Sequence, residues 1–148
     1  MAVDSDLIKL YSTRILALAA DMPQTQRLEA PSSTVMRRSP LCGSTVTVDL
    51  LIEDGVIRDF GQDVKACALG QAAAAVVGAN VIGQTRSGIE TARDQLEAML
   101  KGDGPPPTAP FDGLEVLLPA KDYKNRHASI MLALDATLEG MDAASGQT

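Results

Sequence analysis

Apolar and polar residues follow two different periods in the first third of the chain, and each period predicts an element. Over residues 4–20, Leu and Ile recur every three or four positions, which predicts an amphipathic N-terminal helix that ends before Pro23. From residue 45 to residue 50, polar Thr and Asp alternate with Val and Leu, which predicts a half-buried strand. The segment between them is polar and proline-containing, so we expect an extended connector there.

A β-hairpin is predicted after this strand. Asp54 and Gly55 are a residue pair that favours a two-residue hairpin turn, and the apolar pattern returns over residues 56–60. Residues 62–66 are interpreted as a third antiparallel strand. The middle of the chain is therefore expected to form a three-stranded antiparallel meander.

Helices are predicted for the rest of the chain. An alanine-rich segment begins at Cys67, and Ser87 with Glu90 three residues later forms a capping-box pattern that opens the next helix. A short helix is expected near residues 111–118 and a last, longer helix over residues 125–141. This order predicts an α+β fold, in which helices pack on one face of the three-stranded antiparallel sheet.

The length of 148 residues suits a single domain. We expect four parts within it: an N-terminal helix, a connector, a core and a frayed tail, at residues 1–20, 21–39, 40–141 and 142–148. A hydrophobic fraction of 45% is sufficient for a real core, which must be built from Ala, Leu, Val and Ile because only 3% of the residues are aromatic.

Composition excludes several classes of partner. The net charge of −6 argues against nucleic acid, which requires a basic stripe. No segment approaches the roughly 18 apolar residues that a membrane span needs, so no membrane partner is expected. The first residues carry acids before their apolar run, unlike a signal peptide, and two cysteines make no disulfide framework. We therefore expect a cytoplasmic protein whose thiols stay reduced.

Three residues with metal-binding or nucleophilic chemistry lie at the ends of predicted elements. Cys42 precedes the first predicted strand, Cys67 lies at a strand-to-helix junction, and His127 lies near the start of the last helix. Element ends are where loop-built sites form, and two thiolates with one imidazole suit zinc or iron–sulfur chemistry. The alternative is structural: a free cysteine is often a small buried apolar residue, and His127 would then only cap its helix.

The segments around these residues carry a resemblance to a known family. The stretches "PLCGS", "KACALGQAAAA" and "RHASIMLALDA" occur in that order, and from residue 39 to residue 141 the chain resembles the iron–sulfur cluster scaffold proteins of the IscU, SufU and NifU type. The fold of that family, a three-stranded antiparallel sheet with helices on one side, agrees with the fold predicted from the periodicity.

The resemblance implies a ligand set. Cys42 matches the first ligand cysteine of the family, Cys67 the second, and His127 the ligand position at the last helix. Cys42 is then also the candidate persulfide acceptor. Three firm ligands leave a fourth place open to Ser44, Asp122, water or a thiolate from a partner.

The chain departs from the family pattern at three positions. Ser44 stands where the family has an aspartate tied to cluster release, and Ala66 replaces the glycine before the second cysteine. At the last helix, either His127 matches the family histidine with Ala128 in place of the next cysteine, or His127 replaces a single cysteine. In both registers the third cysteine is missing.

Three roles follow from the resemblance and these departures. The first is a non-enzymatic scaffold that binds iron, assembles a labile [2Fe–2S] cluster and passes it to apoproteins, with a cysteine desulfurase as the sulfur donor. The second is a zinc-bound sulfur-relay protein that accepts persulfide from the desulfurase. The third is a metal-free interaction domain that kept the fold. A monomer or weak dimer is expected, and an independent enzyme is not, since no acid/base pair or nucleotide motif is present.

Overall fold

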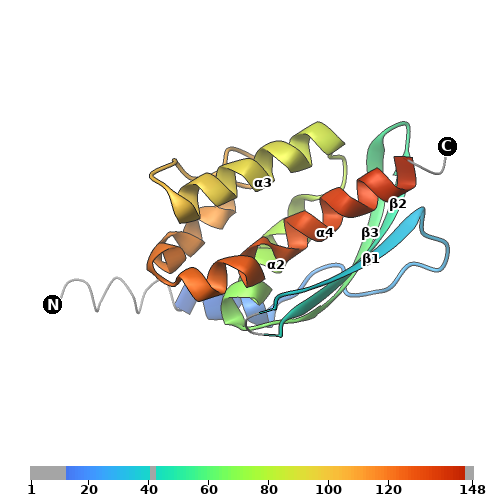
Figure 1. The fold of residues 1–148 in the computed structure, drawn as a ribbon. Helices are drawn as coiled ribbons and strands as arrows, with labels where there is room; N and C mark the ends of the chain where they lie inside the picture. The colour runs from blue at the N-terminus through green and yellow to red at the C-terminus, as the bar shows by residue number, and fades with distance from the viewer. Residues whose placement is uncertain (1–12, 41–42, 146–148) are drawn as a thin grey trace, which may run out of the picture.

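The computed structural model describes residues 13–40 and 43–145 (Figure 1). Residues 13–20 are helical, in agreement with the last part of the predicted N-terminal helix; the rest of that prediction lies outside the described residues. The remaining elements are β1 (Ser33–Arg38), β2 (Thr45–Glu53), β3 (Val56–Lys65), α2 (Ala68–Asn80), α3 (Arg86–Lys101), the 3₁₀ helices η1 (Asp112–Asp122) and η2 (Lys124–Arg126), and α4 (His127–Ser145).

The strands form one antiparallel sheet in the order β1–β2–β3. Asp54 and Gly55 make the tight turn between β2 and β3, with φ angles of 55° and 75°. Positive φ at both turn positions is the type I′ geometry that matches strand twist, and it explains why this residue pair marked the hairpin correctly. The predicted α+β class and three-stranded antiparallel sheet are confirmed.

Two of the predicted strands were wrong in detail. Residues 56–60 and 62–66 are not separate strands, because β3 runs without interruption from Val56 to Lys65. The third strand of the sheet is instead β1, which lies inside the segment expected to be a connector. Its sequence, STVMRR, is short and mostly polar, and its order comes from pairing with β2 rather than from a local apolar pattern.

Three helix boundaries also differ from the prediction. The cap of α3 is Thr85, whose Oγ1 accepts a hydrogen bond from the Gly88 N–H at 3.2 Å, and not Ser87. The short helix expected near residues 111–118 is the 3₁₀ helix η1, with Pro119 inside it. The last helix begins at His127 rather than residue 125 and extends to Ser145, so the first part of the expected frayed tail is helical.

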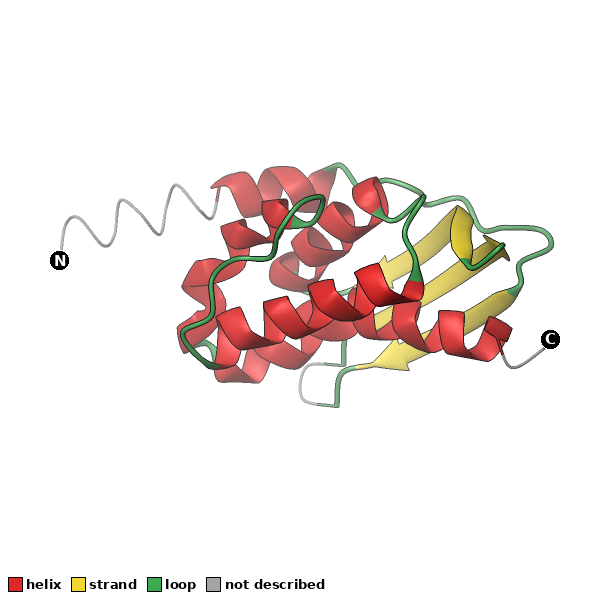
Figure 2. Ribbon diagram, turned by 90° about the horizontal axis from the view of Figure 1, so that it is seen from above, coloured by secondary structure: helices red, strands yellow, loops and turns green. Residues whose placement is uncertain are grey.

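The helices cover one face of the sheet (Figures 1 and 2). Helix α4 crosses β1 and β2, and α2 packs against β3 and α4. The alternating residues Val46, Val48 and Leu50 of β2 are at most 1% exposed, and Leu50 lies against Gly140 of α4. The core thus lies between this face and α4, as the alternation on β2 predicts.

The other face of the sheet is crossed by residues 24–32, which we call the strap. The strap starts at the edge of β3, where the Gln62 N–H donates to the Gln24 carbonyl at 2.8 Å, and ends where the Ser32 N–H donates to the Leu50 carbonyl at 2.6 Å. It passes so close to Gly61 that a β-carbon there would collide with the Gln26 carbonyl. Gly61 therefore permits a second layer on the sheet and does not break β3.

A buried carboxylate holds the middle of the strap. Asp49 of β2 is 0% exposed and accepts hydrogen bonds from the Arg27 guanidinium, the Leu28 N–H at 3.0 Å and Thr34 Oγ1 at 2.6 Å. Burial alone raises the pKa of Asp49, but these hydrogen bonds and the charge of Arg27 outweigh it and hold the pKa below its ordinary value. Asp49 is therefore an ionised anchor for the strap.

Candidate metal centre

Cys67 lies at the junction between β3 and α2, as the sequence predicts. It is the N-cap residue of α2, with extended backbone angles of φ −65° and ψ 169°, and its carbonyl accepts the first helical hydrogen bond from the Gln71 N–H at 2.9 Å. Its side chain is neither buried nor fully exposed. The unpaired N–H groups of the first helical turn place a positive partial charge beside this position.

The loop that carries Cys42 lies at the same end of the sheet as Cys67, although Cys42 itself lies outside the described residues. The Ser39 N–H donates to the Ser44 carbonyl at 2.8 Å, and the Gly43 N–H donates to the Ser39 carbonyl at 3.0 Å, which closes the connection between β1 and β2. Thr45, the first residue of β2, pairs with Lys65, the last residue of β3. The β1–β2 loop and the β3–α2 junction therefore share one end of the sheet.

Two buried hydroxyl groups lie behind the Cys67 sulfur. Ser129 Oγ is 3.6 Å from Cys67 Sγ and donates to Ser44 Oγ at 3.0 Å. Ser44 is 4% exposed and Ser129 is 1% exposed. Ser44 was singled out in the sequence as a candidate fourth ligand, and the structure brings it into this cluster with Cys67.

Ser129 was missed by the sequence reasoning. A signal for it is present: Ser129, Ala133, Ala136 and Gly140 repeat at intervals of four, three and four residues, which places one line of small residues along α4. This line is buried. A hydroxyl within a line of small buried residues needs a polar partner, and that requirement points to Ser129 as part of a site.

Close approach of α2 and α4 creates this cluster. A β-carbon on Gly70, in the first turn of α2, would lie 2.5 Å from Ser129 Oγ and 2.9 Å from the Ala66 β-carbon. Both distances are too short for a real side chain. Gly70 is thus the residue that lets the start of α4 reach the start of α2, and with it the Cys67 sulfur.

His127 occupies the first position of α4 and is 5% exposed. Its Nε2 lies 3.0 Å from the Ala120 carbonyl and 3.2 Å from the Lys121 carbonyl, both in η1. Since carbonyl oxygens only accept, Nε2 carries the proton and donates. A metal bond from His127 would therefore use Nδ1. Asp122, the other candidate fourth ligand, is exposed at the end of η1.

Several basic residues belong to the elements that meet at this end of the protein. Arg38 ends β1 and Lys65 ends β3, and both pair with Thr45 of β2. Lys124 and Arg126 lie in η2, directly before α4. Their positive charges add to the partial positive charge at the start of α2.

The complete ligand set stays a prediction. Among the residues that the structure describes, no three His, Cys, Asp or Glu side chains gather closely enough to hold a metal. The predicted set of Cys42, Cys67 and His127 is a different one, because it includes a residue outside that range. Within residues 13–40 and 43–145, no helix is long and apolar enough to cross a membrane.

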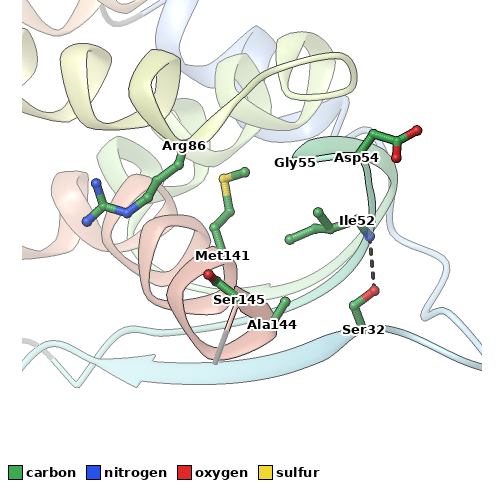
Figure 3. Close-up of a pocket in the computed structure, with 8 residues that line it drawn as sticks. All are labelled: Ser32, Ile52, Asp54, Gly55, Arg86, Met141, Ala144 and Ser145. Carbon is green, nitrogen blue, oxygen red and sulfur yellow. Dashed lines mark hydrogen bonds between the residues drawn. The ribbon is translucent and has the colours of Figure 1, made fainter. Parts of the chain in front are cut away.

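A cavity of about 530 Å³ lies at the opposite end of the sheet (Figure 3). Ile52 and Met141 line it, near the turn at Asp54 and Gly55. Arg86 also borders it, but its guanidinium donates to Asp142 and Glu90. The hydrogen bonds from Arg86 lower the pKa of Asp142. The cavity includes none of the predicted ligands.

Comparison with known proteins decides the family. The chain is 43% identical to the N-terminal part of a nitrogen-fixing NifU-like protein from Brucella abortus, over 91% of this chain and 94% of that one, with a TM-score of 0.89. The chain belongs to the IscU/SufU/NifU scaffold family. No family model matches the sequence.

More distant members of the family agree with this placement. The iron–sulfur cluster assembly scaffold protein IscU of Thermotoga maritima is 27% identical over 94 residues. These residues make up 64% of this chain and 66% of that protein, so the chain spans just under two thirds of the length of this relative. A SufU from Fervidobacterium islandicum, described as a scaffold protein of the SUF system, is 19% identical over 86% of this chain and 93% of that one, with a TM-score of 0.75. The SufU likeness concerns the fold alone.

Proposed function

We propose that this chain is an iron–sulfur cluster assembly scaffold, which binds iron, assembles a labile [2Fe–2S] cluster and passes it to apoproteins. The observation that carries the proposal is the match to the NifU-like protein, which covers 91% of this chain at 43% identity. The role is that of a carrier in the cytoplasm, with no independent enzymatic reaction.

The proposed ligands are Cys42, Cys67 and Nδ1 of His127, with Ser44 or Asp122 as the candidate fourth ligand. Thiolate sulfur is the ligand that iron–sulfur clusters require. The first turn of α2 gives this end of the sheet a positive partial charge, which suits an anionic cargo. The partly exposed Cys67 supports exchange of the cargo with a partner, which an enclosed four-cysteine site would hinder.

The proposed sulfur source is a cysteine desulfurase, and the proposed acceptor is Cys42. The Cys42 thiolate would attack the outer sulfur of the persulfide on the desulfurase, which releases the desulfurase cysteine as a thiolate. Because the third cysteine of the family is missing in either register, Cys42 and Cys67 are the only cysteines in the chain. Cys67, which caps α2, is proposed as a ligand only, whereas Cys42 is proposed both as a ligand and as the sulfur acceptor.

The test is the amount of iron, zinc and acid-labile sulfide per chain after anaerobic purification and after reconstitution with iron and sulfide. We expect iron with matching sulfide in the wild type, and its loss in Cys42→Ser and Cys67→Ser. His127→Gln, which keeps an N–H donor for the carbonyls of η1, separates the ligand role of His127 from its structural role. Ser33→Ala, far from the site, is the matched control and should bind like the wild type.

A zinc-bound sulfur relay is the second candidate function. It is favoured by the same missing cysteine, because a set of two cysteines and one histidine is one that zinc accepts readily. Zinc without sulfide in the wild type, lost in the cysteine variants, would contradict the scaffold and support the relay. No metal in the wild type after reconstitution would contradict both and leave the interaction domain.

A further inference from the structure

The Cys67 sulfur faces a hydroxyl group that can act in two ways. Ser129 Oγ lies 3.6 Å from Cys67 Sγ and donates its proton to Ser44 Oγ at 3.0 Å. A serine hydroxyl has one proton to donate and two lone pairs to accept with. While that proton points to Ser44, Ser129 presents a lone pair to the sulfur, which suits a thiol because the S–H can donate to it.

Metal binding reverses what the sulfur needs. A cysteine binds metal as a thiolate and releases its proton to solvent. The sulfur then has nothing to donate, and a lone pair of Ser129 would face its negative charge. Rotation of the Ser129 hydroxyl about the Cβ–Oγ bond replaces this repulsion with a hydrogen bond to sulfur.

We propose that Ser129 is a positioning residue whose hydroxyl turns from Ser44 to the Cys67 sulfur when that sulfur binds metal, and thereby stabilises the metal–thiolate bond. The inference rests on the proposed function, since it requires that Cys67 binds metal. It extends the site to a residue that is not itself a ligand and acts only through Cys67. Hydrogen bonds to ligand sulfur are one of the means by which proteins tune such centres.

Burial makes this hydroxyl hard to replace. Ser129 is 1% exposed, so bulk water does not reach its place. The contact with α2 at Gly70 is already too tight for a β-carbon, and it fixes Ser129 behind the sulfur. Removal of the hydroxyl should therefore leave the side of the sulfur that faces α4 without a donor.

Cobalt(II) is the probe, because its thiolate complexes have a sulfur-to-metal charge-transfer band that reports the energy of the sulfur electrons. The full chain is titrated with Co²⁺ under anaerobic conditions as wild type, Ser129→Ala and Ser33→Ala. Ser33 is a matched control: it is a buried serine whose hydroxyl donates to the Gly140 carbonyl near the far end of α4. Both variants lose one buried hydroxyl, but only one of these hydroxyls contacts sulfur.

We expect Ser129→Ala to move the band to longer wavelength and to weaken Co²⁺ binding about 10-fold, within the range known for partners of metal ligands. Ser33→Ala should change neither. An unchanged band in Ser129→Ala, with Co²⁺ bound, would overturn the inference and leave the proposed function intact. A wild type that binds no Co²⁺ would overturn the inference together with the metal centre of the proposed function.

Discussion

At the scale of single residues, the carboxylate of Asp49 shows how a buried charge fastens a surface segment. It accepts hydrogen bonds from Arg27 and Leu28 of the strap and from Thr34 of β1. Arg27 is half exposed, whereas Asp49 has almost no contact with water. The stabilisation therefore depends on the protonation state of Asp49, whose pKa in the folded protein is lowered.

We expect this dependence to appear in acid. Because the folded pKa lies below the unfolded value of about 3.9, the contribution of Asp49 is fully present above about pH 4 and is lost as pH falls through the folded pKa. Asp49→Asn should lower the free energy of unfolding by about 1–3 kcal/mol at neutral pH and flatten its decline in acid. Urea unfolding across a pH series measures both effects.

Asp112→Asn is the control for this experiment. Asp112 is exposed at the start of η1, so its substitution should leave the pH profile of stability unchanged. An acid decline in Asp49→Asn as steep as in the wild type would show that other carboxylates cause it, and would contradict the role assigned to Asp49.

The candidate ligands were easier to single out from the sequence than the buried residues beside them. Cys67 and His127 were singled out because the chain has few residues of their kind and both lie at element ends, and their role as ligands stays a prediction. Ser129 and Asp49 carry no such mark, since serine and aspartate are common at any surface. The line of small residues along α4 is the one sequence signal for Ser129, and the partners of both Ser129 and Asp49 are distant in sequence.

At the scale of elements, the contact between α2 and α4 depends on Gly70. Alanine normally stabilises a helix interior relative to glycine by about 1 kcal/mol. At Gly70 the added β-carbon would lie 2.5 Å from Ser129 Oγ. We expect Gly70→Ala to destabilise the protein by about 1–3 kcal/mol, the usual cost of overpacking, and to weaken metal binding, because α4 must move away from Cys67. Thermal unfolding and metal titration test this.

Gly88→Ala is the matched control in α3. A β-carbon there would meet only the far end of the Gln84 side chain, which can move. This substitution should be neutral or stabilising, in line with helix propensity. A gain of stability in Gly70→Ala as well would show that α2 and α4 separate at no cost, and would contradict the packing argument.

The elements that the sequence analysis misread are those that depend on distant partners. Strand β1 is held by its pairing with β2 and by the hydrogen bond from Ser33 to Gly140, and its own residues have no apolar alternation. Residues 56–60 and 62–66 were predicted as separate strands, although Gly61 between them continues β3 and makes room for the strap. The hairpin and α2, whose signals are local, were found nearly where the structure has them.

At the scale of the whole molecule, the sheet and α4 connect two ends with different chemistry. The metal ligands are proposed at one end, and the cavity beside Met141 lies at the other. The nine residues of β2 separate the two ends by roughly 30 Å at the usual rise of a strand. The α+β class and the one-sided packing were predictable because they follow from the order of the elements, which the periodicity shows.

We expect the two ends to respond separately to substitution. Met141 is 4% exposed and lines the cavity, so Met141→Ala should lower the free energy of unfolding by about 2–5 kcal/mol. Metal stoichiometry and affinity should match the wild type below the unfolding temperature. Met141→Leu, which conserves volume, should cost under about 1.5 kcal/mol. Weaker metal binding in Met141→Ala at a temperature where it is folded would contradict this independence.

The β2–β3 turn offers a place for attachment. Asp54 and Gly55 are exposed at the end opposite to Cys67, and exposed turns are where proteins best accept inserted residues. A short affinity tag or fluorophore-acceptor peptide inserted there would attach the protein to a surface by the end opposite to Cys67. Both cysteines would stay unmodified, and any partner that docks over the basic end would approach an unobstructed face.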